Sequence, residues 1–487
     1  MRNNRPNILL FMSDNQSADF IGCYGNNEIK TPNIDLLAQN GIKYTAAFCA
    51  NAMCSPCRAS VLTGLIPSAH GIHNWLDDNL ESQWPEDWNA IGEFDTFPNK
   101  LKEAGYLNAL IGKYHLGKAW KSSDAFDHWI TFPHGHTKSF YKNKIIDNNK
   151  TYEHEGHSVE FFTEKTIEFI DSNKENKNPF FCFVPFNGPY GHWPSIKGKP
   201  TNKFAKLYDD CELSTVPREG INKRVIDRFS NRILESGGSL PEQFSGPLLL
   251  PNNKDSLRNY FSQATLIDDG IGRILQKLRT SSMLENTIVI YTSDHGFSLG
   301  NHGIWGHGMA AWPSSIHRPS FNIPLIFSGP GIIKGVSETF VSQLDLANTL
   351  LDLADAEKLK GHRVDSKILD LSDLNSQNRK MLFMEQEESR AIRNEQWLYI
   401  ERFNKDSLSY LGSELYDLKE DPDERNNLSN SVSHKNTISS LSKELSQYYD
   451  KFSDPKFNLW AGGSAKSNVS NPSFWKKAWG SKWKTTI

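Results

Sequence analysis

The chain has 487 residues, of which 38% are hydrophobic and 23% charged, and its formal net charge is −3. This length allows one large domain and a smaller one, with a core that needs no disulfide bonds. The charge balance gives no global basic field for nucleic acid or an anionic membrane, so we expect neither partner. An anionic substrate would have to be captured by a local cluster of basic groups.

The cysteine content and the first residues bear on the compartment. Six cysteines are sparse for this length and are not spaced like a disulfide framework or an all-cysteine zinc site, so we expect reduced thiols. The first apolar run, residues 7–12, is too short for the core of a signal peptide, and no run approaches a membrane span. We expect a cytoplasmic protein for the sequence as written, or a periplasmic or secreted one if a leader has been trimmed.

The chain opens with a pattern of strands and helices. Residues 7–12 form a continuous apolar run typical of a buried parallel strand, and it ends in Ser13-Asp14-Asn15. A helix is predicted over 31–38 from its capping residue, its proline and its apolar spacing. Helix followed by strand then recurs three times, and the predicted pairs are 99–104 with 107–111, 159–172 with 180–185, and 256–278 with 287–292.

The predicted strands all deliver polar clusters at their carboxyl ends. After the first strand these clusters are 112–115, 187–192 and 293–296. Because active sites of open α/β sheets gather at that edge, the sequence predicts an α/β fold with a doubly wound sheet, flanking helices and one composite site.

The rest of the chain indicates two further regions. Residues 195–250 are polar and turn-rich and are predicted to be a surface insertion in a catalytic domain over 1–375. Short strand-like pieces after 375 indicate a smaller C-terminal α+β subdomain over 376–487. Its tryptophan-rich tail is expected to cover apolar surface and not to recognise a ligand; these residues are Trp460, Trp475, Trp479 and Trp483.

One short motif carries most of the functional information. Residues 54–58 read Cys54-Ser55-Pro56-Cys57-Arg58, and the run continues to Leu62-Thr63-Gly64. A C-x-x-C pair can indicate redox chemistry, but these flanking residues supply no thioredoxin-like context. The C-x-P-x-R pattern instead resembles the signature of the type I sulfatases of the alkaline phosphatase superfamily. Four further segments are similar to the family's motifs, so that the resemblance covers nearly the whole chain: 6–15, 31–38, 112–117 and 414–424.

The resemblance implies a nucleophile that is made after translation. In this family the first cysteine of the motif, here Cys54, is oxidised to formylglycine by a formylglycine-generating enzyme. One hydroxyl of the aldehyde hydrate attacks the sulfur of a sulfate ester, and loss of a proton from the other expels sulfate as the aldehyde forms again. The implied fold is an alkaline-phosphatase-like mixed sheet.

A divalent cation is predicted at the ends of two strands. Asp14, Asn15, Asp294 and His295 supply mostly hard oxygen ligands, which suits one Ca²⁺, with Mn²⁺ or Mg²⁺ as alternatives. The resemblance adds the group derived from Cys54 to these ligands. It also marks a departure, because the family usually carries a second aspartate where Asn15 stands.

The remaining catalytic roles rest on the resemblance. Arg58 lies one helical turn after Cys54, where a guanidinium can hold the aldehyde hydrate. Lys113 is expected to bind sulfate oxygens and His115 to act as a base; alternation on an extended segment would let both face the site. His192 matches a histidine near the bridging oxygen. His307 stands where relatives commonly carry a lysine that protonates the leaving group, and it is the main departure.

The substrate pocket is less well defined. The sequence gives Lys113, His192, His307, Asn74 and His302 as substrate-binding candidates, and nearby loops add further ones, namely His73, Trp75, His134, His136 and Trp312. Aromatic side chains among them would suit a sugar ring or a quaternary ammonium group.

We therefore predict a sulfatase, a sulfuric ester hydrolase whose substrate is a sulfated carbohydrate. Three alternatives stay open: a formylglycine-dependent phosphonate monoester or phosphodiester hydrolase, a sulfatase for a small molecule such as choline sulfate, and a non-catalytic protein that binds sulfated ligands. A two-zinc phosphatase would want a serine or threonine nucleophile and further ligands that the sequence does not offer. Assembly into a homo-oligomer is also compatible with the sequence.

Overall fold

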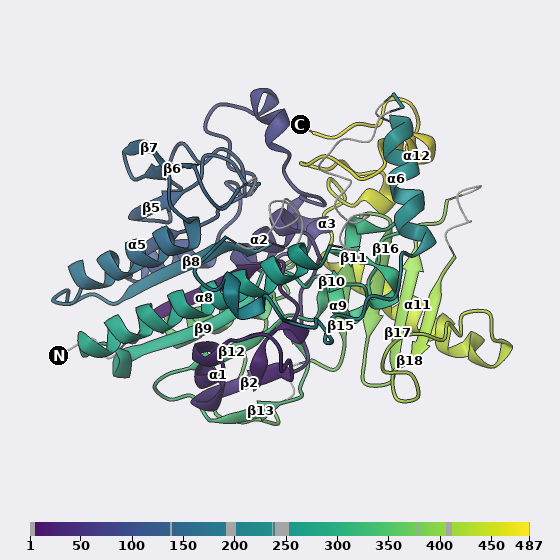
Figure 1. Ribbon diagram of the computed structural model, residues 1–487. Coiled ribbons are helices and arrows are strands. Elements are labelled where there is room, and N and C mark those ends of the chain that lie inside the picture. The colour runs from purple at the N-terminus through teal and green to yellow at the C-terminus, as the bar shows by residue number, and fades with distance from the viewer. Residues whose placement is uncertain are drawn as a thin grey trace.

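The computed structural model describes residues 5–136, 139–190, 201–235, 237–238, 253–376, 379–405 and 412–486. Its centre is a ten-stranded sheet with the order β13-β2-β12-β9-β1-β8-β4-β5-β6-β7 (Figure 1). These strands are β1 Asn7–Asp14, β2 Gly41–Tyr44, β4 Leu107–Ile111, β5 His128–Thr131, β6 Asn143–Asp147, β7 Lys150–His154, β8 Phe180–Pro189, β9 Thr287–Ser293, β12 Leu325–Ser328 and β13 Gly335–Ser337.

Strand β1 lies at the middle of the sheet because it is apolar on both faces. It pairs in parallel with β8 and with β9, so that Ile8 lies opposite Phe181 on one side and Ile288 on the other. All eight residues of β1 are buried. Alternate residues of β1 enter different clusters: Leu10 belongs to the core on one face and Leu9 to the core on the other.

Helices cover both faces of this sheet, which confirms the predicted doubly wound α/β fold (Figure 1). One face packs against α1 Pro32–Gln39, α5 Ser158–Ser172 and α8 Lys254–Thr280. The other packs against α2 Cys54–Thr63, α4 Phe97–Glu103 and α10 Asp345–Leu353. The sheet is mixed, because β12 runs antiparallel to both β9 and β2, and β6 and β7 form an antiparallel edge. Shorter elements are β3 Ala47–Phe48, β10 Ser298–Leu299, β11 Trp305–Gly306, β14 Val341–Ser342, α3 Pro67–His70 and α9 Arg318–Phe321.

A smaller antiparallel sheet follows in the C-terminal part, as predicted. Its order is β15-β16-β17-β18, and its strands are β15 Leu382–Glu385, β16 Ser389–Arg393, β17 Trp397–Arg402 and β18 Glu414–Asp417. Helix α11, Lys435–Phe452, packs on it through Leu441 and Leu445. Around α12, Pro472–Trp479, the tail tryptophans Trp475 and Trp483 are buried in an apolar cluster with Trp312. The domain boundary at residue 375 stays a prediction.

The segment predicted to be a surface insertion is partly buried where the structure describes it. Within 201–235, Tyr208 is buried against Phe261 of α8. Helix α6, Lys223–Glu235, packs Val225 and Phe229 against the loop that contains Ala310. This contact could not be predicted from the sequence, because the few apolar residues of the segment are separated by lysines and turn residues. The insertion thus supports the loop that carries His307.

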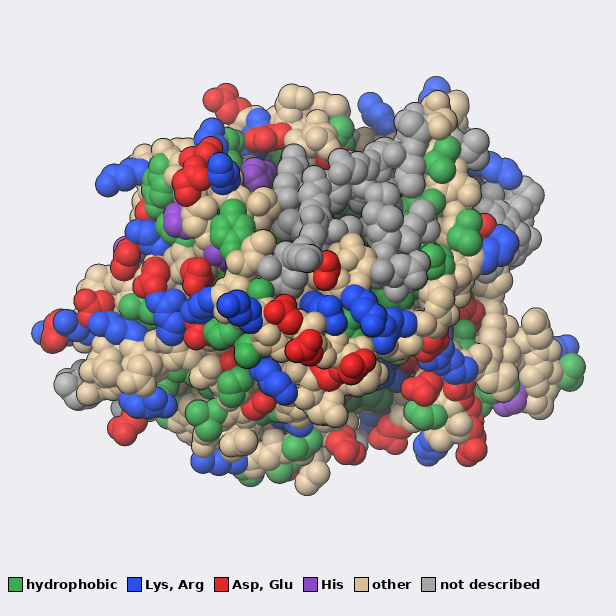
Figure 2. All heavy atoms as spheres, in the orientation of Figure 1, with side chains coloured by type: hydrophobic (Ala, Val, Ile, Leu, Met, Phe, Trp, Pro, Cys, Tyr) green, Lys and Arg blue, Asp and Glu red, His purple; other side chains and the backbone are tan. Residues whose placement is uncertain are grey.

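The surface agrees with the charge balance of the chain. Lysine and arginine side chains alternate with acidic ones over the face shown in Figure 2. Among the helices of the described residues, none combines the length and the apolar character that crossing a bilayer requires.

Candidate active site

Helix α2 presents Cys54 at its first position. Met53 precedes it in an extended conformation, and the amide of Cys57 donates to the Met53 carbonyl at 3.0 Å to close the first turn. Pro56 is compatible with this turn, because the first backbone N–H groups of a helix have no partner inside it. Every residue of α2 is buried. The helix therefore holds the Cys54 side chain at the carboxyl-terminal edge of the sheet, where β1 and β9 end.

Four charged side chains surround Cys54 in a buried network. Arg58 Nη2 donates to Asp14 Oδ2 at 3.2 Å and to Asp294 Oδ2 at 2.9 Å. Arg58 Nη1 donates to the Lys113 carbonyl at 2.7 Å, and Lys113 Nζ donates to Asp14 Oδ2 at 2.5 Å. All four side chains are at most 1% exposed. Two cations thus balance two carboxylates away from water, which offsets the desolvation of each charge.

The network shifts the pKa of Asp294, Arg58 and Lys113. Burial opposes the charge of Asp294, but His295, Arg58 and Lys113 together lower its pKa below the ordinary value. Burial likewise opposes the charges of Arg58 and Lys113, and the carboxylates still raise the pKa of both. Burial raises the pKa of the Cys54 thiol well above its ordinary value, so the unmodified cysteine is a neutral thiol and a poor nucleophile.

The predicted metal ligands converge in the structure. Ligand atoms of Asp14, Cys54, Asp294 and His295 all lie within 4.8 Å of one another. His295 Nδ1 lies 2.8 Å from the Gly296 carbonyl, and donation to that carbonyl leaves the Nε2 lone pair available, 3.5 Å from Cys54 Sγ. Asn15 adopts a left-handed backbone with φ of 63°, and neither atom of its buried amide has a hydrogen-bond partner among the described residues. An oxygen-rich set with an unpaired amide oxygen fits a divalent cation.

Lys113 and His115 follow β4 but do not alternate along an extended segment. Lys113 reaches the network, whereas His115 has a left-handed backbone with φ of 57°. His115 Nε2 lies 3.0 Å from the Leu76 carbonyl, and the buried Nδ1 has no partner among the described residues. Burial and the neighbouring Lys113 lower the pKa of His115 well below its ordinary value. A neutral imidazole with a free ring nitrogen suits the predicted base, whose role stays a prediction.

Of the two remaining catalytic candidates, only His307 lies within the described residues. His307 lies beside the cluster, because its ring centroid is 5.8 Å from that of His295 at a nearly perpendicular angle. Met309, two residues after His307, packs with Met53 and Cys54. His192 lies outside the described residues, so its predicted catalytic and substrate-binding roles stay predictions.

The structure separates the predicted pocket residues into two groups. Trp75 packs against the cluster of Met53, Cys54 and Met309, and its ring also contacts His136. The others contact residues outside that cluster. Asn74 donates to Glu387, His73 Nε2 lies 2.8 Å from the Phe457 carbonyl, and His134 Nδ1 lies near the His136 carbonyl. The rings of His302 and Trp312 pack on His317 and Phe474, respectively. The Asn74 amide also donates to Ser470, and its oxygen accepts from the Trp75 amide, so its polar atoms are paired within the protein and it positions this loop. Its predicted contact with substrate stays a prediction.

One set of residues that supports the site was not predicted from the sequence. These residues are Glu385, which ends β15, and Gln386, Glu387 and Glu388, which connect it to β16 in the C-terminal sheet; all four are buried. A run of polar residues between two strands is typical of an exposed turn, so the sequence offers no signal that it is an interior feature. The contacts of this turn bring the C-terminal part of the chain against the loops around Cys54.

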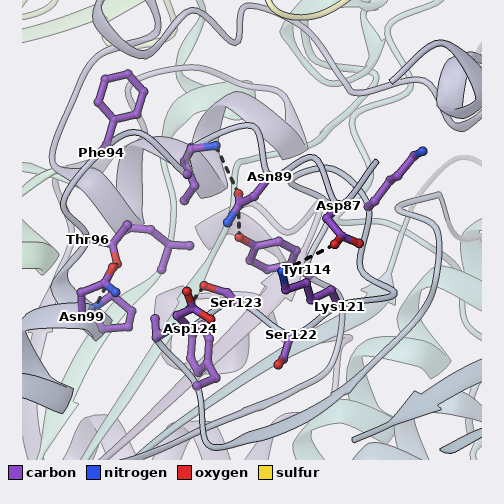
Figure 3. A pocket seen from close by; sticks show the side chains of 17 residues that line it. Asp87, Asn89, Phe94, Thr96, Asn99, Tyr114, Lys121, Ser122, Ser123 and Asp124 are labelled. Atoms are coloured by element: carbon purple, nitrogen blue, oxygen red, sulfur yellow. Dashed lines mark hydrogen bonds and ion pairs between the residues drawn. The ribbon is translucent and has the colours of Figure 1, made fainter. Parts of the chain in front are cut away.

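A separate cavity of about 220 Å³ lies behind the segment that carries Lys113 and His115. Tyr114 lines it and donates to Asn89 at 3.1 Å, and Asp87 pairs with Lys121 at its rim (Figure 3). Of the described residues that line this cavity, none belongs to the charged network or to the predicted metal ligands. This cavity is therefore distinct from the cluster around Cys54.

Comparisons with known proteins identify the family. The model of the sulfatase family matches residues 6–356, and a model described as N-sulphoglucosamine sulphohydrolase, C-terminal, matches residues 313–451. The chain is 27% identical to an N-acetylglucosamine-6-O-sulfatase of Bacteroides thetaiotaomicron, over 93% of this chain and 88% of that protein.

Solved structures agree with this assignment. One, described as a complex with its substrate D-glucosamine-2-N,6-O-disulfate, matches with a TM-score of 0.70 and 25% identity over 92% of this chain and 98% of the other. The structure of a phosphonate monoester hydrolase of Agrobacterium radiobacter matches with a TM-score of 0.65 and 19% identity, over 93% of this chain and 97% of the other chain. At this identity, the match shows only that the two proteins share a fold. The family model covers well over half of the chain, and the residues it spans include the network around Cys54. The chain therefore belongs to the sulfatase family and is a sulfuric ester hydrolase.

Proposed function

We propose that this sulfatase hydrolyses the sulfate ester of a sulfated saccharide, with formylglycine at position 54 and one divalent cation, best Ca²⁺. The observation that carries the proposal is the position of Cys54: its Sγ lies within 3.9 Å of Asp14 Oδ1 and 3.5 Å of His295 Nε2, at the start of a buried helix. A saccharide substrate is supported by the relative named as an N-acetylglucosamine-6-O-sulfatase and by the neighbour solved with a disulfated glucosamine.

The residues of this chain suit a cation at that position. Asp14, Asn15, Asp294 and His295 would hold the ion, and Ca²⁺ is favoured because three of the four side chains offer hard oxygen atoms. A cation there would acidify a hydroxyl of the modified side chain and neutralise part of the charge of the sulfate. Because Arg58 and Lys113 already balance the two carboxylates, a cation would give the site a net positive charge, which attracts an anionic ester.

The other side chains have complementary tasks. Arg58 orients the two carboxylates and lies one helical turn from position 54, where its charge favours an oxyanion. Lys113 supplies an ammonium group for sulfate oxygens. His307 is the candidate donor of a proton to the leaving alcohol, in place of a lysine. The neutral His115 is the candidate acceptor of a proton from position 54.

The first experiment is mass spectrometry of the peptide that contains Cys54, from protein produced together with a formylglycine-generating enzyme. Conversion of thiol to aldehyde lowers the mass by about 18 Da. The converted protein is then assayed with an aryl sulfate, an aryl phosphodiester and a 6-sulfated hexosamine, with and without Ca²⁺. We expect turnover of both sulfates, stimulated by Ca²⁺, and slow turnover of the phosphodiester. A converted protein that prefers the phosphodiester, or that binds sulfated sugar without releasing sulfate, would contradict the proposal.

A further inference from the structure

The turn between β15 and β16 places four consecutive polar side chains in the interior. Glu385, Gln386, Glu387 and Glu388 are each at most 2% exposed. Removing a carboxylate or a carboxamide from water is unfavourable unless it finds hydrogen-bond partners inside the protein. The partners of these four side chains therefore show what the turn does.

The three glutamates each bind a different segment near the site. Glu385 accepts from the Ser68 amide at 2.7 Å, in the segment that follows α2. Glu387 accepts from Asn74 Nδ2 at 2.7 Å, next to Trp75, which packs on Cys54. Glu388 accepts from the Ser314 amide at 2.6 Å, in the segment that follows His307. The turn thus holds together the loops that surround the reacting group.

Gln386 is the exception within this turn. Neither its Oε1 nor its Nε2 has a hydrogen-bond partner among the residues that the structure describes. Its amide lies against Gly308: a Cβ atom placed there would come 2.5 Å from Gln386 Nε2 and 3.3 Å from the Cβ of Ala52. Gly308 lies between His307, which contacts His295, and Met309, which packs on Cys54. An unpaired amide therefore borders the segment that carries the candidate proton donor.

The chemistry of the amide restricts what it can bind. A carboxamide offers two donor hydrogens and one acceptor oxygen. A sulfate group offers acceptors only and would leave Oε1 unpaired, and the aromatic ring of an aryl ester would leave both atoms unpaired. A hydroxyl group both donates and accepts, so a pair of ring hydroxyls can satisfy the two ends of the amide at once.

We propose that Gln386 determines substrate specificity by binding ring hydroxyls of the saccharide next to the sulfate ester. This inference rests on the proposed function and deepens it, because it assigns the recognition of the sugar to a residue of the C-terminal sheet. The unpaired amide is unfavourable in the free enzyme, and the substrate supplies the missing partners. A substrate without hydroxyls at that position gains nothing from it.

The test compares Gln386→Met with the wild-type enzyme, both carrying formylglycine as verified by mass. Methionine has a similar length and no hydrogen-bonding requirement. Gln276→Met, on the exposed side of α8, is the matched control. The substrates are a 6-sulfated N-acetylhexosamine, its analogue without the neighbouring hydroxyl, and 4-nitrophenyl sulfate.

We expect Gln386→Met to lower kcat/KM for the sulfated sugar about ten- to a hundredfold, the loss of one or two neutral hydrogen bonds. The same variant should leave 4-nitrophenyl sulfate and the deoxy analogue unchanged and should keep or raise Tm, because it removes an unpaired buried amide. A purely structural amide would instead give a lower Tm and an equal loss on all three substrates, which would overturn the inference, as would unchanged selectivity.

The outcomes for the wild-type enzyme separate the two proposals. Turnover of the sugar sulfate with no effect of Gln386→Met overturns only the role of Gln386. Turnover of 4-nitrophenyl sulfate without turnover of any sulfated sugar overturns the proposed substrate class, and the role of Gln386 with it. Fully converted enzyme that cleaves no sulfate ester overturns the proposed function.

Discussion

Arg58 Nη2 lies 3.2 Å from Asp14 Oδ2, and both side chains are at most 1% exposed. The same nitrogen also donates to Asp294, so one guanidinium neutralises two carboxylates that would otherwise repel each other. A divalent cation held by these carboxylates would also neutralise part of their negative charge. The guanidinium and the cation should therefore each be able to stabilise the fold when the other is absent, because both neutralise the same carboxylates.

Arg58→Met tests this relationship. Removal of one partner of a buried ion pair costs about 3–5 kcal/mol, so the variant should lose that much free energy of unfolding in EDTA. Ca²⁺ should raise the Tm of Arg58→Met more than that of the wild type. Urea unfolding and thermal scans with and without Ca²⁺ measure both effects, and Arg279→Met on the exposed end of α8 is the control. An equal response of variant and wild type to Ca²⁺ would show that the ion lies elsewhere.

Asn15 sets the charge of the predicted metal site. Asn15→Asp adds a third carboxylate, which should tighten Ca²⁺ binding about tenfold because the added attraction exceeds the extra repulsion once the ion is bound. In EDTA the same variant should be less stable than the wild type, since three carboxylates then share two cations.

Calorimetric titration with Ca²⁺ measures the affinity of this variant, with Asn286→Asp, an exposed position after α8, as the control. The Asn15→Ala variant, which loses the unpaired amide oxygen, should bind Ca²⁺ more weakly. Unchanged affinity in both Asn15 variants would remove Asn15 from the ligand set.

The parts of the site predicted from the sequence are those with local signals. Continuous apolar runs followed by polar clusters define β1, β4 and β9, and parallel strands bring their carboxyl ends to one edge. Asp14, Lys113 and Asp294 therefore meet as expected.

The parts that were not predicted depend on long-range packing. The left-handed backbone of His115 is stabilised by contacts with a loop almost forty residues earlier, and nothing in its neighbours along the chain indicates it. The turn at 385–388 contains three glutamates and one glutamine, a composition typical of a solvated surface, and its burial follows from partners more than 70 residues away. Side chains that act through such long-range contacts can be identified only from the structure.

His307 should make activity depend on pH in a way that a lysine would not. An imidazole with an ordinary pKa of about 6.5 loses its proton near neutrality, whereas an amine with an ordinary pKa of about 10.4 keeps it. If His307 protonates the leaving alcohol, His307→Lys should move the alkaline limb of the kcat/KM profile upward by at least one pH unit. The profile is measured with 4-nitrophenyl sulfate and with a sulfated sugar, because the better leaving group needs less protonation and should respond less. An alkaline limb that stays in place for both substrates would assign the proton donor to another residue.

Glu424 connects the C-terminal part of the chain to the α/β part, since it accepts a 2.9 Å hydrogen bond from His317 Nδ1 and pairs with Arg393 at 2.6 Å. Burial opposes its charge, but Arg393 and His317 lower its pKa to about 2, below the ordinary value of 4.5. A carboxylate with a lowered pKa contributes stability above the unfolded pKa, and this contribution is lost as pH falls from about 4.5 towards 2.

Glu424→Gln should therefore cost about 3 kcal/mol at pH 7, and the difference from the wild type should shrink steadily below pH 4.5. Urea unfolding at pH 7, 5, 4 and 3 measures it, with the exposed Glu420→Gln as the control. Parallel pH curves for Glu424→Gln and the wild type would contradict a charged Glu424 at this contact, because a protonated side chain would lose nothing on acidification.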